Sequence, residues 1–123
     1  MIKTRYLLAV FVGWAVIGLT SGAWAQASEY RVRDLLEPCV EGDNDSRGGA
    51  VLEMECEQYV SGFTDLYVQS GMAKADKVCL PKQNQADEIR WAFMRWAHQN
   101  FDKRNIPAVD GLIATLRKAF KCK

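Results

Sequence analysis

CEQYVSGFTDLY, residues 56–67, carries a helical pattern that begins near residue 50 and continues to about residue 70. Its apolar residues recur at steps of three and four, which predicts an amphipathic helix. Gly71 follows, and glycine commonly ends helices. The predicted apolar stripe consists of Leu52, Cys56, Tyr59, Val60, Phe63, Leu66 and Tyr67.

The same periodicity recurs in three other segments. Residues 28–37 predict a short helix with Ser28 as its N-cap, ended by Pro38 because the residue before proline disfavours helical geometry. Asn84 is suited to cap a helix that ends near residue 101, and Pro107 to start a last one. Their stripes are Ala86, Ile89, Phe93, Trp96 and Ala97, then Val109, Leu112, Ile113, Leu116, Ala119 and Phe120. No long period-two pattern occurs, so we predict an all-α, four-helix domain.

Residues 1–25 have the layout of a secretory signal peptide. Lys3 and Arg5 precede an apolar run over residues 6–19, and small residues follow at Ala23 and Ala25. The run is shorter than the roughly 20 apolar residues of a membrane span. We expect cleavage after Ala25, or alternatively after Ala27, leaving residues 26–123 as one exported domain without membrane attachment.

Four cysteines remain after cleavage, and an even number in an exported chain predicts disulfides. There is no CxxC pair and His98 is the only histidine, which argues against a metal site. Sequential helices with short connections are antiparallel. This arrangement brings the end of the first helix near the start of the second, and the start of the third near the end of the fourth. The predicted disulfides are Cys39–Cys56 and Cys79–Cys122.

The charge is distributed unevenly along the chain. Residues 26–70 carry ten acidic and three basic side chains, whereas residues 71–123 carry five acidic and eleven basic ones. The near balance overall argues against nucleic-acid binding. The asymmetry indicates either two faces that attract each other within the fold or a basic surface for an acidic partner.

No constellation predicts catalysis, a cofactor or a bound metal. A cysteine–histidine hydrolase needs a free thiol beside its base, and the cysteines are expected in disulfides. Glu53, Glu55 and Glu57 are attributed to the start of a helix, where acids complement its dipole. Asp65 is interpreted as a solvated or hydrogen-bonded helix residue, and its role stays open. We therefore expect a protein that is not an enzyme.

Two features suggest contacts with other surfaces. Helix 84–101 has a second apolar line, interpreted as core or alternatively as a dimer contact. Its residues are Trp91, Met94, His98 and Phe101. Gly62 costs up to about 1 kcal/mol of helix propensity relative to alanine. That cost predicts close approach by another backbone, from a neighbouring helix or a second subunit.

Taken in order, the cysteines and the residues around them resemble the Rap/Tai family of type VI secretion immunity proteins, over nearly all of residues 35–123. The residues that carry the resemblance are Cys56, Tyr59, Val60, Gly62, Asp65, Cys79, Leu80, Pro81, Ala119, Phe120 and Cys122. The chain departs from the family pattern at Gln58 and Lys121, where the family often has glycine and proline. These departures leave the cognate partner open.

The resemblance implies a periplasmic, disulfide-bonded protein that is often a homodimer. It also implies binding to a type VI effector, a cysteine–histidine amidase that cuts the peptide crosslinks of peptidoglycan, with inhibition by occlusion of the amidase active site. In the family, the turn between the last two long helices reaches into the effector cleft. The corresponding residues are Asp102, Lys103, Arg104, Asn105 and Ile106; from the residues alone they form an ordinary solvated connection.

Two other functions fit a small exported helical protein. One is a periplasmic stress protein or chaperone similar to the acid-stress chaperone HdeA, which should expose apolar surface at low pH. The other is an inhibitor or accessory factor of the cell's own wall hydrolases.

Overall fold

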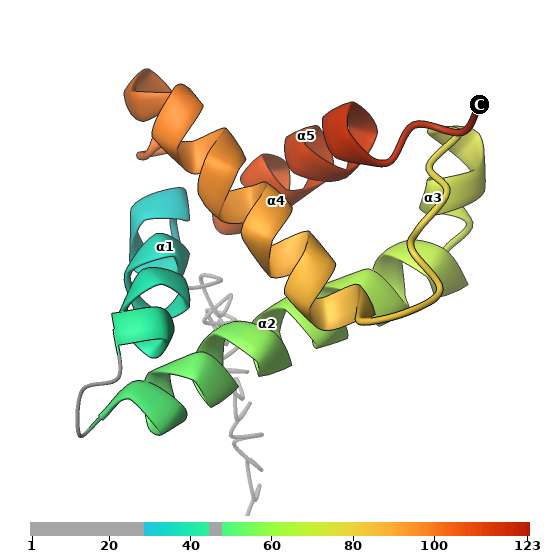
Figure 1. The fold of residues 1–123 in the computed structure, drawn as a ribbon. Helices are drawn as coiled ribbons and strands as arrows, with labels where there is room; N and C mark the ends of the chain where they lie inside the picture. Colours follow the sequence, from blue (N-terminus) through green and yellow to red (C-terminus); the bar gives the residue numbers. More distant parts are fainter. Residues whose placement is uncertain (1–28, 45–47) are drawn as a thin grey trace, which may run out of the picture.

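A computed structural model describes residues 29–44 and 48–123 (Figure 1). The predicted signal peptide and Ser28 lie outside these ranges. The helices are α1 (Val32–Glu41), α2 (Gly49–Gln69), α3 (Met72–Ala75), α4 (Gln85–Gln99) and α5 (Ala108–Ala119), with 3-10 turns η1 (Gly42–Asn44) and η2 (Phe101–Lys103). Within these ranges there is no strand, so the all-α prediction is confirmed. None of the described helices is both long enough and apolar enough to span a membrane.

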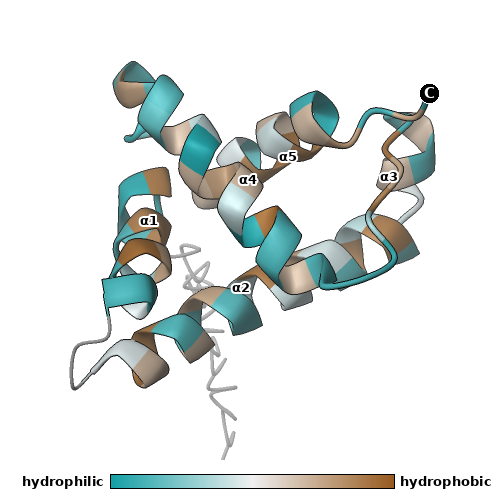
Figure 2. Cartoon of the chain, viewed as in Figure 1, coloured by the Kyte–Doolittle hydropathy of each residue, from teal (hydrophilic) through white to brown (hydrophobic). Residues whose placement is uncertain are grey.

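The four longer helices pack around one core. α1 and α4 both contact α2, and α5 packs against α4 and α1, while the short α3 extends from the end of α2 (Figure 1). Each long helix carries both hydrophobic and hydrophilic residues (Figure 2). The fully buried core residues are Val32, Leu35, Cys39, Cys56, Val60, Ile89, Phe93, Ala97, Ala108, Leu112 and Leu116.

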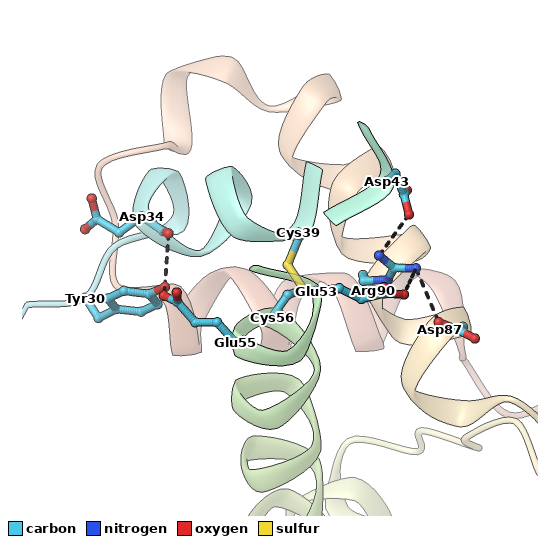
Figure 3. Close-up of a disulfide and its surroundings, with 9 residues drawn as sticks. All are labelled: Tyr30, Asp34, Cys39, Asp43, Glu53, Glu55, Cys56, Asp87 and Arg90. Atoms are coloured by element: carbon cyan, nitrogen blue, oxygen red, sulfur yellow. Dashed lines mark hydrogen bonds and ion pairs between the residues drawn. A yellow bond between two sulfur atoms is a disulfide. The ribbon is translucent and has the colours of Figure 1, made fainter. Parts of the chain in front are cut away.

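The prediction that Pro38 ends the first helix was wrong, because Pro38 lies inside α1. Proline lacks an N–H group, so the carbonyl of Asp34 loses its usual helical donor. The hydroxyl of Tyr30 donates to that carbonyl instead, at 3.0 Å (Figure 3). A side chain from before the helix thus satisfies the acceptor, and α1 continues to Glu41.

One expectation for α2 was also wrong, and one of the two alternatives for Gly62 is excluded. Leu66 is 68% exposed, whereas Thr64 is buried and donates to the carbonyl of Val60 at 2.7 Å. Adjacent helical residues are separated by about 100°, so the face that buries Tyr67 turns Leu66 toward solvent. Gly62 is exposed, and among the described residues nothing lies within 4 Å of a Cβ built on it. No described helix of this chain therefore approaches Gly62 closely, and approach by a second subunit stays a prediction.

Both disulfides have the predicted pairing. Cys39–Cys56 joins α1 to α2 within the core (Figure 3), and Cys79–Cys122 joins the segment before α4 to the C-terminus. Gly71 ends α2 as expected, with a φ of 80° that suits glycine. α4 begins after Asn84, which caps it through its carbonyl rather than its side chain.

Candidate partner-binding site

The turn between α4 and α5 is held in place by α1. The N–H of Val32 donates to the carbonyl of Ile106 at 3.0 Å, and that of Arg33 donates to the carbonyl of Arg104 at 3.0 Å. The first N–H groups of a helix have no partner within it. The turn therefore caps α1, and α1 in return fixes the path of the turn.

The predicted residues of this turn divide into two groups. Asp102, Lys103 and Asn105 are exposed. Arg104 is half-buried, with its guanidinium 4.4 Å from the centre of the Phe101 ring. Ile106 is half-buried and packs against the core. The turn thus offers three side chains to a partner, while the other two attach it to the domain.

α1 also reaches this turn through a side chain. The Nη1 atom of Arg33 donates to the Oδ1 atom of Asn105 at 3.0 Å. These residues are 72 positions apart, and no local pattern could have connected them. The participation of α1 is the part of the candidate site that the sequence did not predict.

The second apolar line of α4 adjoins the turn. Trp91 is 41% exposed and Phe101 is 72% exposed, so the interpretation as core was wrong for these two residues. Met94 is half-buried and packs against the core. Trp91, Met94 and His98 line a shallow depression on the outer face of α4. The Nδ1 atom of His98 lies 3.4 Å from Nη2 of Arg104, which connects the depression to the turn. We call the combined area the α4–turn surface; it comprises Trp91, Met94, His98, Phe101, Asp102, Lys103 and Asn105.

A second polar cluster surrounds Arg90, which is only 3% exposed (Figure 3). Its guanidinium contacts Asp43 at 3.0 Å, Asp87 at 3.3 Å and Glu53 at 3.6 Å. The carboxylates of Glu53, Glu57 and Asp87 converge closely enough to hold a metal ion. Two of these three acids already neutralise Arg90, so a cation would have to compete with the guanidinium. We therefore interpret the cluster as structural.

The expected dipole role of the α2 acids was wrong. α2 begins at Gly49, which leaves Glu53, Glu55 and Glu57 beyond its first turn. Glu53 pairs with Arg90 instead. Oε1 of Glu55 lies 3.2 Å from the Tyr30 hydroxyl and shares its single proton with the carbonyl of Asp34.

A third polar cluster ties α2, α3 and α5 together. The hydroxyl of Tyr67 donates to Asp76 at 2.6 Å, and Arg117 donates to the other carboxylate oxygen at 2.8 Å. These two hydrogen bonds lower the pKa of Asp76. Burial raises the pKa of Tyr67 to about 12, and its hydrogen bond to Asp76 acts in the same direction. Both carboxylate oxygens of Asp76 accept hydrogen bonds from within the cluster, which indicates a structural role.

The protein has no free thiol for cysteine–histidine catalysis. All four cysteines are in disulfides, so His98 has no thiol to activate. Asp65 is exposed on α2, and its role stays open.

The chain matches a known protein family over most of its length. The model of Rap1a immunity proteins matches residues 31–122. The chain belongs to this family. The matched range spans all the described helices, both disulfides and the turn. Comparison with curated proteins and with solved structures found no match.

Membership of the Rap1a immunity family confirms the resemblance seen in the sequence. It implies an effector protein as the partner and a non-catalytic, inhibitory role. The assignment of residues 102–106 to the interface stays a prediction.

Proposed function

We propose that the chain is a periplasmic immunity protein that binds a type VI secretion effector, a peptidoglycan amidase, and inhibits it by occluding its active site. The family match supports an immunity role. The observation that carries the mechanism is the α4–α5 turn, whose exposed side chains stand on a backbone held by α1.

A turn fixed in this way is suited to insertion into a cleft. Ordering a loop on binding costs free energy, and a loop that is already ordered avoids most of that cost. Phe101 lies at the start of the turn, and Trp91 lies further back on α4. Both are exposed aromatic residues, a type enriched at protein interfaces. In the proposed complex the turn enters the cleft and the aromatic residues pack on its rim.

Lys103→Glu tests the role of the turn. Lys103 is exposed, whereas Arg104 packs on Phe101 and its replacement would also change the fold of the turn. We expect Lys103→Glu to weaken inhibition of a peptidoglycan amidase effector by at least about tenfold, equivalent to about 1.4 kcal/mol, with the melting temperature unchanged. If a neighbouring gene encodes an amidase, that amidase is the first effector to test.

Lys82→Glu is the matched control, because Lys82 is exposed in the connector before α4 and undergoes the same charge reversal. Equal inhibition by both variants would remove the turn from the mechanism. Failure of the unaltered chain to inhibit amidases would instead contradict the proposed target.

The periplasmic location rests on the signal-peptide pattern of residues 1–25 and on the two disulfides, which form in oxidising compartments. We expect the expressed protein in the periplasmic fraction with Gln26 or Ser28 as its first residue. Cytoplasmic protein that retains Met1 would contradict this location.

We also propose that the protein forms a homodimer, as the family resemblance implies. Exposed Val51, Met54 and Leu66 share the outward side of α2 with Gly62. Because no atom of the described residues lies within 4 Å of a Cβ on Gly62, Gly62→Leu should fold normally as a monomer. Light scattering should show a dimer that this variant disrupts; a dimer that tolerates leucine would place the contact elsewhere.

A further inference from the structure

The two disulfides differ sharply in their exposure. Cys39 and Cys56 are both 0% exposed, so this bond is shielded by the folded core. Cys79 is exposed and Cys122 is half-buried, and both line a surface hollow of about 700 Å³. A thiol in solution can therefore approach only the Cys79–Cys122 bond while the protein stays folded.

The hollow beside this disulfide is strongly basic. Its lining includes Lys74, Lys77, Lys121 and Lys123, above an apolar floor. Asp76 is the acidic residue between Lys74 and Lys77 in the sequence. Its carboxylate is already paired with Arg117 and accepts a hydrogen bond from Tyr67. Positive charge attracts anions and stabilises thiolates, which are the reactive form of cysteine.

We propose that Cys79–Cys122 is a site of thiol–disulfide exchange that favours anionic thiols. The attacking thiolate forms a bond to the sulfur of Cys79, the more exposed residue, and the Cys79–Cys122 bond breaks. Cys122 leaves as a thiolate flanked by Lys121 and Lys123. A second thiolate then releases Cys79, so that two thiols are oxidised to one disulfide and the protein gains two electrons and two protons.

The backbone around this bond is paired independently of the sulfur atoms. The N–H of Cys79 donates to the carbonyl of Phe120 at 2.7 Å, and the N–H of Cys122 donates to the carbonyl of Lys77 at 2.8 Å. These two bonds keep the cysteines close after reduction, so the exchange is reversible. The proposal does not depend on the identity of the effector.

Timed reduction of the native protein with dithiothreitol, followed by alkylation and peptide mapping, tests the difference in access. We expect Cys79 and Cys122 to be alkylated at least about tenfold faster than Cys39 and Cys56, while circular dichroism shows the helices intact. Equal rates, or faster reduction of the core bond, would overturn the proposal.

The charge preference is tested with two small thiols, the anion mercaptoethanesulfonate and the cation cysteamine, at equal thiolate concentration. The anionic thiol should react several-fold faster at low salt, and the difference should shrink at 1 M salt because the charges are screened. Lys74→Glu combined with Lys121→Glu should abolish the preference, because the two glutamates offset the remaining Lys77 and Lys123. The control pair Arg95→Glu with Lys103→Glu makes the same charge change on α4 and the turn, and should leave it unaltered. If both double variants reacted with the same preference for the anionic thiol, a role for the hollow would be refuted.

Discussion

Replacing Gly111 by alanine tests the packing that positions the turn. Gly111 lies in α5, where a Cβ atom would lie 2.5 Å from Cγ2 of Val32 and 3.1 Å from Cζ3 of Trp96. Favourable contacts between carbon atoms are about 3.5–4.0 Å. Val32 would therefore have to move by about 1 Å. It is fully buried, β-branched and bonded through its N–H to Ile106 of the turn, so it has little room to do so.

The expected magnitude follows from two opposing effects. Alanine gains about 1 kcal/mol of helix propensity over glycine. Overpacking of a core costs about 1–3 kcal/mol, and the contact with Val32 argues for the upper end. The free energy of unfolding should thus fall by about 2 kcal/mol, which lowers the melting temperature of a domain of this size by about 8–16 °C.

Gly62→Ala is the control, because it makes the same change in a helix with open space around it. Measured by thermal and urea denaturation at a concentration where the protein is monomeric, it should raise stability by up to about 1 kcal/mol. Gly111→Ala should also weaken effector inhibition, since Val32 holds the turn. If Gly111→Ala were as stable as the unaltered protein, the reasoning about this contact would be refuted.

Three further predictions concern charge and pH. Neutralising the three acidic partners of Arg90 should lower the free energy of unfolding by about 2–3 kcal/mol, because it leaves a buried charge without its partners. Arg90→Met should lower it by less, as measured by urea denaturation. Equal losses in the two variants would contradict this. Stability should fall as pH rises from about 10 toward 12, because unfolded tyrosine loses its proton before folded Tyr67 does. In melting curves recorded at alkaline pH, Tyr67→Phe should reduce this dependence of stability on pH. ANS fluorescence should stay low at about pH 3 if the protein is an immunity protein, and a large rise would favour the acid-stress chaperone.

The helices could be predicted because they depend on local patterns, and the disulfide pairing because successive helices with short connections pack antiparallel. The stripe of α4 and the buried positions Leu112 and Leu116 of α5 follow from a 3.6-residue period. Cys39 lies near the end of α1 and Cys56 in the first half of α2, so the packing of these successive helices brings the two cysteines together. Leu66 was misplaced because steps of three and four admit more residues than one buried face can hold.

The candidate site was only partly predictable, because its geometry depends on contacts between segments that are far apart in the sequence. The family pattern indicated residues 102–106, but the sequence showed neither that α1 fixes this turn nor that Arg104 packs on Phe101. The contact between Arg33 and Asn105 joins residues 72 positions apart, and periodicity carries no information over that distance.

Sequence by itself determined the all-α class, three of the four long helices, the crosslinks and the family, through the order and spacing of apolar residues and cysteines. The first helix runs over Val32–Glu41 and not over residues 28–37. Only the tertiary structure decided that Pro38 stays within a helix, that Gly111 is crowded whereas Gly62 is not, and that Cys79–Cys122 is the exposed disulfide. Each of these depends on which atoms of distant segments come together: the Tyr30 hydroxyl, the Val32 methyl group and the lysines around the C-terminus.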